Sequence, residues 1–260
     1  MGVVSREPEW SPPTEPLVLE SNQVHVWRAS LELSSLRLKG LQRILSVDEL
    51  QRAKQFVRQK DQDAFVAARG VLRLILSRYL KQGPESLYFC YGSHGKPALS
   101  FECNPDGLCF NLSHSGGLAL YAVAMNQELG VDLEQVHTNL AYEAIAQRFF
   151  SPQESATLLA LPPHDRVQAF FNGWTRKEAY VKAEGHGISL PLKQFDVSLA
   201  PGEVAAIVSI AGDFQAGTQW TLQALDPGLG YVAALAIKGR TWQVKCWHWE
   251  EAHNEIDTYS

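Results

Sequence analysis

The stretch WTRKEAYVKAEGHGISLPL, residues 174–192, holds the pattern on which the prediction of fold and site depends. Trp174, Glu178 and Lys182 follow one another at intervals of four residues, so they share one face if the stretch is helical. On an ordinary surface helix, Glu178 and Lys182 would form a solvated pair worth about 0.2–0.5 kcal/mol. A face in the core would not carry the two charges. The stretch is therefore either a plain surface or one half of a binding site.

The composition is that of a globular protein, with 260 residues of which 45% are hydrophobic and 20% charged. No run reaches the roughly 18 apolar residues of a membrane span, and residues 1–20 lack the basic and apolar regions of a secretory signal. We therefore expect a cytoplasmic protein with no membrane partner. The net charge of −5 argues against a nucleic-acid partner, because phosphate contacts need a basic surface. A small phosphorylated ligand in a local basic pocket stays possible.

The cysteines show no spacing typical of a metal or redox site. In a cytoplasmic chain they are expected to be buried, reduced thiols. They are Cys90, Cys103, Cys109 and Cys246.

The first part of the chain predicts a leader, a strand and two helices. Residues 1–16 are rich in proline and predict a flexible leader. Residues 22–33 predict a strand. The segment VDELQRAKQF predicts a helix with Ser46 as its N-cap and Glu49 completing a capping box. In the next helix, over residues 63–81, apolar side chains recur at helical spacing.

Two arginines, Arg69 and Arg73, fall on the other side of this second helix. Like charges one turn apart repel slightly. In solvent they would have no function, and facing a pocket they would bind an anion.

Helices and short strands share the rest of the chain. Residues 166–185 predict a helix that ends at Gly185 and Gly187, and the residues after 190 predict short strands separated by glycine and proline turns. This order favours an α+β fold over a doubly wound α/β fold. The plan of helices followed by strands occurs twice, which suggests an internal duplication.

The segment GVDLEQV, residues 130–136, predicts a strand with Asp132 and Glu134 on one face and Val131 and Leu133 on the other. Neighbouring carboxylates repel unless a cation lies between them, and hard oxygen ligands suit Mg²⁺. A solvent-facing side of an ordinary strand would give the same alternation.

The segment FNLSHSGG, residues 110–117, predicts a polar turn whose hydroxyls and backbone N–H groups could bind an anion. A serine hydrolase is disfavoured, because the adjacent Ser113 and His114 would point to opposite faces of a strand. The nucleophile motif G-x-S-x-G is also absent. His114 could equally be a structural, hydrogen-bonding histidine.

The segment GKPAL places Lys96 in a turn shaped by Gly95 and Pro97. A solvated lysine is the ordinary interpretation of such a turn. The frames G-x-x-x-x-G-K-[ST] and G-x-G-x-x-G are both missing, which argues against the nucleotide-binding folds that use them.

Together the motifs fit one design. If Glu178 joins Asp132 and Glu134, three carboxylates can hold one Mg²⁺ and leave positions for phosphate oxygens. The groups around such a metal-bound diphosphate would be Lys96, Ser113, His114 and Lys182.

The motifs GKP, FNLSHS, GVDLE and WTRKEAYVKAEGHGISLPL occur in the order of the Sfp-type 4′-phosphopantetheinyl transferases, which the chain resembles over residues 40–200. This family transfers 4′-phosphopantetheine from coenzyme A to a serine of an apo acyl or peptidyl carrier protein, with Mg²⁺, and leaves adenosine 3′,5′-bisphosphate. Its members are pseudo-dimers. The resemblance implies an α+β fold with a pseudo-two-fold duplication, with halves at 17–125 and 126–260, the active site in the cleft between them, and a monomer.

The resemblance also implies a role for each matching residue. The magnesium ligands would be Asp132, Glu134 and Glu178. The contacts of coenzyme A would be Arg52, Gly95, Lys96, Pro97, Ser113, His114, Asp132 and Lys182. Some relatives carry a second lysine three residues before Arg52, where this chain has Glu49. The 3′-phosphate would therefore depend more on Arg52, with Arg69 as a further candidate.

In the implied reaction, Lys182 and His114 stabilise charge on the leaving bisphosphate, and Glu178 is the best candidate for the base. Lys177 could hold its helix in place or meet an acidic carrier protein. The segment RFF, residues 148–150, is the expected docking place for the carrier, with core packing of its two phenylalanines as the alternative.

Fatty-acid, polyketide and nonribosomal-peptide carriers all fit the resemblance, and the sequence does not choose among them. The alternative function is a non-catalytic protein of the same fold that binds coenzyme A or a phosphometabolite. The presence of all three acids and Lys182 argues against it.

Overall fold

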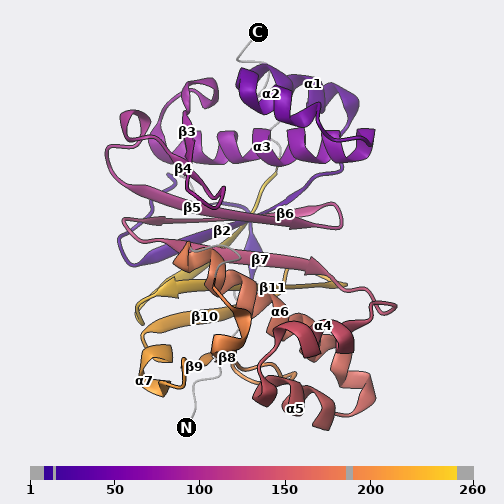
Figure 1. Cartoon of the computed structure of the whole chain (residues 1–260). Coiled ribbons are helices and arrows are strands. Elements are labelled where there is room, and N and C mark those ends of the chain that lie inside the picture. Colours follow the sequence, from indigo (N-terminus) through magenta and orange to yellow (C-terminus); the bar gives the residue numbers. More distant parts are fainter. Residues whose placement is uncertain (1–8, 14–15, 186–189, 251–260) are drawn as a thin grey trace.

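Two helices of 22 residues, α3 (Gln59–Leu80) and α6 (Pro163–Glu184), each cover the outer face of a β-sheet. The computed structural model describes residues 9–13, 16–185 and 190–250. Figure 1 shows four layers, in which the two sheets lie against each other between the helices of the first half and those of the second.

The other helices are α1 (Ser35–Ile44), α2 (Val47–Ala53), α4 (Tyr142–Phe149), α5 (Pro152–Ala160) and α7 (Phe214–Gly217). The first sheet has the order β1 (Trp10–Ser11), β12 (Gln243–His248), β2 (Gln23–Ser30), β6 (Leu118–Met125) and β5 (Leu108–Ser115). The second has the order β10 (Trp220–Leu225), β11 (Tyr231–Lys238) and β7 (Leu129–Gln135). Two hairpins complete the fold: β3 (Phe89–Tyr91) with β4 (Pro97–Leu99), and β8 (Phe195–Val197) with β9 (Ile207–Ile210).

The same order of elements occurs twice along the chain. In the first half, β2 is followed by α1 to α3, the hairpin β3–β4, and the long strands β5 and β6. In the second half, β7 is followed by α4 to α6, the hairpin β8–β9, and the strands β10 and β11. Each half pairs its first strand with its last, in the orders β2-β6-β5 and β7-β11-β10. The predicted α+β fold with two similar halves is confirmed.

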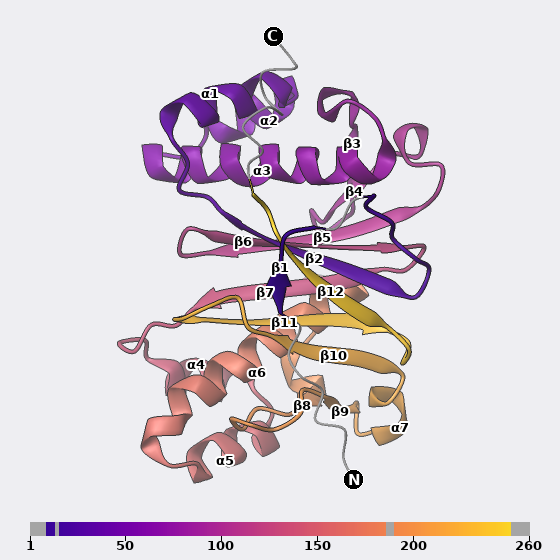
Figure 2. The same ribbon diagram turned by 180° about the vertical axis from the view of Figure 1, so that it is seen from behind.

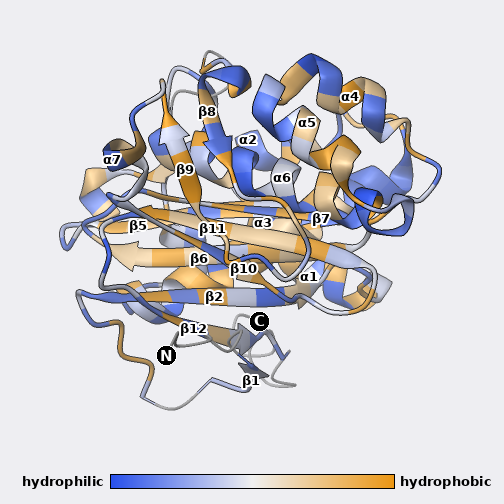
Figure 3. Ribbon diagram, turned by 90° about the horizontal axis from the view of Figure 1, so that it is seen from below, coloured by the Kyte–Doolittle hydropathy of each residue, from blue (hydrophilic) through white to orange (hydrophobic). Residues whose placement is uncertain are grey.

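An apolar core between the sheets holds the two halves together. It contains buried side chains from strands of both sheets, among them Val26, Leu120, Val131, Leu133 and Leu235. Figure 3 shows hydrophobic colouring along much of β6 and β11. Each such side chain contributes about 1.5–3 kcal/mol when it is fully buried, so this core strongly opposes separation of the sheets.

The strand β12 leaves the second half of the chain and joins the sheet of the first (Figure 2). It runs parallel to β2, with Cys246 opposite Val26, and β1 adds to its other edge. The other strands of the last part of the chain, β8 with β9 and β10 with β11, pair antiparallel, and β12 is the exception. Of the predicted leader 1–16, residues 1–8, 14 and 15 lie outside the described part of the chain.

Of the two alternatives considered for Arg69 and Arg73, exposure to solvent is wrong, because both side chains are buried. Helix α2 packs against this side of α3 and buries Glu49 between the two guanidinium groups. The Nε atoms of Arg73 and Arg69 lie 2.8 and 3.2 Å from the Glu49 carboxylate, which also accepts the backbone N–H of Ser46 at 2.9 Å, as the capping box predicted. Glu49 is thus a structural counter-ion, a role that a lysine at this position could not take.

Burial of the cysteines follows the prediction in part. All four are free thiols. Cys103 and Cys246 are buried, Cys109 is half-buried, and Cys90 is exposed, so the prediction of burial is wrong for Cys90.

Among the helices of the described residues, none has the length and apolar character that a membrane span requires.

Candidate active site

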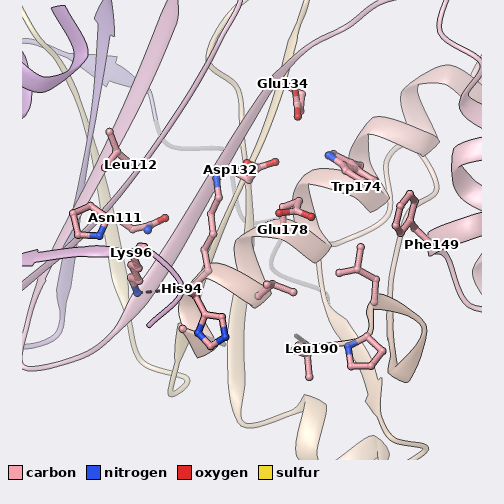
Figure 4. Close-up of a pocket in the computed structure, with 17 residues that line it drawn as sticks. His94, Lys96, Asn111, Leu112, Asp132, Glu134, Phe149, Trp174, Glu178 and Leu190 are labelled. Atoms are coloured by element: carbon pink, nitrogen blue, oxygen red, sulfur yellow. Dashed lines mark hydrogen bonds and ion pairs between the residues drawn. The ribbon is translucent and has the colours of Figure 1, made fainter. Parts of the chain in front are cut away.

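A cavity of about 700 Å³ is lined by α6, β7, the middle of β5, the end of α4, the β3–β4 turn and residues 190–192. Figure 4 shows Lys96 and Asn111 on one side of it, Phe149, Trp174 and Leu190 on the other, and carboxylates between them. The cavity therefore has a charged end and an apolar end. The lining includes seven residues predicted from the sequence: Gly95, Lys96, Pro97, Asp132, Glu134, Glu178 and Lys182.

Helix α6 forms one wall of the cavity. Trp174, Glu178 and Lys182 all line it, as their spacing of four residues predicted. The helix ends at Gly185, whose φ of 73° is the left-handed conformation that closes many helices. Gly187, the second predicted stop, lies outside the described residues.

Strand β7 approaches α6 so closely that only glycine fits at its second position. A Cβ atom on Gly130 would lie 2.0 Å from the carbonyl oxygen of Ala179 and 2.5 Å from the backbone nitrogen of Ala183. Asp132 and Glu134 share a face with Gly130 because side chains alternate along a strand. The close approach therefore brings both carboxylates to the helix face that carries Glu178 and Lys182.

The ammonium group of Lys182 is held by three acceptors. It donates to Asp132 Oδ1 at 2.6 Å, to Ser113 Oγ at 2.9 Å and to the carbonyl of Val131 at 3.1 Å. Ser113 donates to the same oxygen of Asp132 at 2.9 Å. Lys182 thus pairs with an acid from another element, and not with Glu178 one turn away on its own helix.

The three carboxylates of the cavity lie close enough to influence one another. Burial raises the pKa of Glu178, and the negative charge of Asp132 raises it further. The pKa of Glu134 is raised by the same two causes in the same order, while hydrogen bonds from Ser115 and Trp174 lower it. Without a bound ligand, the protein therefore has an excess of negative charge at the charged end of the cavity.

One oxygen of this group has no partner in the described structure. Asp132 Oδ2 is buried and accepts no hydrogen bond, and such an atom is costly to leave unpaired. In the described residues no three acidic, histidine or cysteine side chains are arranged to hold a metal ion. The orphaned oxygen and the mutual repulsion of three oxygen donors nevertheless fit a hard divalent cation.

The polar alternation of FNLSHS has a structural use that the sequence analysis missed. Strands β5 and β7 are edge strands of different sheets, and β5 side chains satisfy the free edge of β7. Asn111 Oδ1 accepts the N–H of Val131 at 2.9 Å, and Ser115 Oγ accepts the N–H of Gln135 at 3.1 Å. A regular alternation of Asn and Ser on a strand is the signal that could have indicated this.

Lys96 reaches across from the β3–β4 turn to the second half. Its ammonium donates to Glu128 Oε2 at 2.5 Å, to the carbonyl of Lys182 at 2.9 Å and to that of Leu129 at 3.2 Å. Lys96 and Glu128 are 32 residues apart in the chain. No motif around either residue indicates that they pair.

Three of the predicted contacts, Arg52, Ser113 and His114, lie outside the cavity lining. His114 is exposed, and it follows Ser113 on β5. Arg52 is exposed at the end of α2 with its guanidinium 5.9 Å from the ring centre of Phe65. Arg69 is buried against Glu49 and donates to the hydroxyl of Tyr91 at 2.8 Å.

Lys177 holds its helix in place, which is one of the two roles that the sequence left open. It is fully buried, with its ammonium 2.8 Å from Glu154 Oε2 and donating to the carbonyls of Leu192 and Phe195 at 2.7 and 2.6 Å. Burial lowers the pKa of Lys177 and raises that of Glu154, and the attraction between them opposes both shifts. Because Leu192 lines the cavity, the pair of Lys177 and Glu154 also holds the cavity wall formed by residues 190–192 in place.

Of the two phenylalanines of RFF, Phe150 has the core role considered for it, and carrier docking at this segment stays a prediction. Phe149 lines the cavity and meets Trp174 edge to face, with ring centres 5.7 Å apart. Phe150 is a core residue, 1% exposed, that stacks on Phe170.

Comparison with known proteins gives matches over both halves. A model described as the 4′-phosphopantetheinyl transferase superfamily matches residues 128–236, and one described as 4′-phosphopantetheinyl transferase, N-terminal, matches residues 27–126. The chain is 41% identical over 240 residues to the 4′-phosphopantetheinyl transferase HetI of Nostoc sp., with 92% of this chain and 98% of that protein covered. The chain belongs to the 4′-phosphopantetheinyl transferases.

Two further relatives share a smaller part of the chain. The 4′-phosphopantetheinyl transferase Sfp of Bacillus subtilis is 32% identical over 157 residues, which cover 60% of this chain and 66% of Sfp. The putative 4′-phosphopantetheinyl transferase slr0495 of Synechocystis sp. is 38% identical over 157 residues, which cover 60% of this chain and 63% of slr0495. The resemblance drawn from the motifs is confirmed, and so is the prediction that this phosphopantetheinyl transferase is an enzyme.

Proposed function

We propose that this phosphopantetheinyl transferase uses coenzyme A as its donor and the serine hydroxyl of apo acyl or peptidyl carrier proteins as its acceptor. One observation carries the proposal: Gly130 lets β7 approach α6 so closely that the acids of the strand meet Glu178 and Lys182 at one end of a cavity of about 700 Å³. A cavity of this size suits a small-molecule ligand, and an ammonium beside oxygen donors suits a diphosphate.

The residues of the chain divide the work of the reaction. The serine oxygen bonds to the phosphorus next to pantetheine, and the bond from that phosphorus to adenosine 3′,5′-bisphosphate breaks, with the electron pair leaving on the bisphosphate. Lys182, oriented by Ser113 and Val131, stabilises that charge. The serine proton is assigned to Glu178, whose carboxylate lines the cavity.

The magnesium ligands in this proposal are Asp132, Glu134 and Glu178. A bound Mg²⁺ supplies positive charge that neutralises the diphosphate. The buried, unpartnered Oδ2 of Asp132 supports the assignment. The remaining assigned contacts of coenzyme A are Arg52, Gly95, Lys96, Pro97, Ser113 and His114.

The test is to incubate the protein with coenzyme A, Mg²⁺ and several apo carrier proteins and to weigh the carriers by mass spectrometry. We expect each accepted carrier to gain one phosphopantetheine. Fatty-acid, polyketide and peptide-synthetase carriers in parallel would identify the pathway served. Binding of coenzyme A without any mass gain on any carrier would favour the non-catalytic alternative.

Replacing Arg52 by alanine tests the assigned contact with the 3′-phosphate. An exposed ion pair contributes up to about 1 kcal/mol, so we expect the affinity for coenzyme A to fall roughly fivefold. The affinity for 3′-dephospho-coenzyme A should not change. Titration calorimetry with both ligands measures the difference, and equal weakening of both would contradict the contact.

We also propose that the enzyme is a cytoplasmic monomer with halves at residues 17–125 and 126–260 and the active site in the cleft between them. The cavity supports this proposal because its lining comes from both halves of one chain. Light scattering of the purified protein would test the monomer.

A further inference from the structure

The ammonium of Lys96 has no donor to spare in the free protein. A lysine ammonium has three N–H donors, and Lys96 has three acceptors: the carboxylate of Glu128 and the carbonyls of Leu129 and Lys182. Lys96 also lines the cavity. An anionic ligand that reaches Lys96 must therefore displace one of the three acceptors.

Two of these acceptors are fixed by the fold. Leu129 is the first residue of β7, and Lys182 lies in the last turn of α6, where a cation near the carbonyls is favourable. Neither carbonyl can leave unless the strand or the helix moves. Both keep the ammonium in place when the third acceptor changes.

Glu128 is the acceptor that can leave. Its side chain is 60% exposed, whereas that of Lys96 is 19% exposed. An ion pair so exposed to water favours the paired state of Lys96 and Glu128 by at most about a few-fold. Water can solvate the carboxylate once it is released. Glu128 is also positioned so that its negative charge opposes any phosphate approaching Lys96.

We propose that Glu128 is an internal counter-ion of Lys96 that phosphate groups must displace, and that it thereby sets the affinity of the cavity for its donor substrate. The inference rests on the proposed function, because it assumes that the cavity takes a diphosphate. Glu128 does not act in the chemical step. Its removal should change binding and leave the turnover number unchanged.

The test compares the wild-type protein with Glu128→Gln, which removes the charge and keeps the size of the side chain. We expect coenzyme A to bind about three- to fivefold more tightly to the variant, as measured by titration calorimetry. The gain should shrink as salt is raised from about 0.05 to 0.5 M, because salt screens exposed charges. The variant's KM for coenzyme A should fall by a similar factor at constant kcat.

Two controls separate displacement from a general charge effect. Glu102→Gln removes the same charge from an exposed site elsewhere and should leave the affinity unchanged. In a Lys96→Met background, Glu128→Gln should no longer tighten binding. Equal tightening by Glu102→Gln, or tightening that persists without Lys96, would overturn the proposal.

The same titrations with inorganic pyrophosphate distinguish this proposal from the proposed function. If the wild type fails to bind coenzyme A, the assigned substrate is wrong. The displacement of Glu128 is then tested by whether Glu128→Gln binds pyrophosphate more tightly than the wild type does. If the variant binds neither coenzyme A nor pyrophosphate more tightly than the wild type does, or binds both more weakly, Glu128 does not compete with phosphate for Lys96 and the proposal is refuted.

Discussion

Replacing Asp132 by alanine is expected to lower the rate of phosphopantetheine transfer by about 10²–10³-fold, the scale of effect seen when a charge-stabilising group is lost. Asp132 supplies the buried, unpartnered oxygen of the cavity and is the acid that Lys182 contacts. The fold should survive, because Lys182 keeps Ser113 and the Val131 carbonyl as acceptors and is 28% exposed to water. Glu178→Gln should have a comparable effect on the rate.

Initial rates measured from the mass of the carrier, with thermal unfolding of each variant, would check this expectation. Unfolding midpoints within about 5 °C of the wild type would show that the loss is not caused by unfolding. The exposed Glu102→Gln is a suitable control for the loss of one negative charge and should retain full activity. A rate within about tenfold of the wild type in Asp132→Ala would remove Asp132 from the site.

Replacing Gly130 by alanine is expected to damage both stability and activity. The new Cβ would lie 2.0 Å from the carbonyl of Ala179, a backbone atom that cannot turn aside, so the strand and the helix must move apart. Overpacking of this kind costs typically about 1–3 kcal/mol and sometimes more. That corresponds to a fall in the unfolding midpoint of roughly 2–12 °C for a chain of this size. The transfer rate should fall further than the stability explains, because the same movement separates Asp132 from Lys182.

The matched control is Gly92→Ala. A Cβ atom there would approach its nearest neighbour no closer than 3.8 Å, so the unfolding midpoint should stay within about 2 °C. If Gly130→Ala unfolds at the wild-type temperature with normal activity, the close approach of β7 to α6 does not organise the site.

Local periodicity accounts for most of what the sequence could predict. The spacing of Trp174, Glu178 and Lys182 placed them on one helix face, and the alternation of Asp132 and Glu134 placed them on one strand face, as the structure shows. Both inferences need only the geometry of a single element. The repeated order of helices and strands likewise predicted two similar halves.

The pairing of buried charges could not be predicted in this way. Arg73 lies 24 residues from Glu49, and its partner depends on how α2 packs against α3. For Lys177 the sequence left two roles open, and only the fold shows that Glu154 and two carbonyls surround it. A single sequence shows the residue types of such pairs but not the packing that brings them together.

The hydrogen bonds along the edge of β7 have a consequence for solubility. An edge strand with free N–H and carbonyl groups can recruit a strand from another molecule and start aggregation. Here Asn111 and Ser115 take two N–H groups, and Lys96 and Lys182 take two carbonyls. Side chains next to the cavity thus also close the edge to foreign strands, so substitutions chosen to study function at these positions should also be examined for self-association.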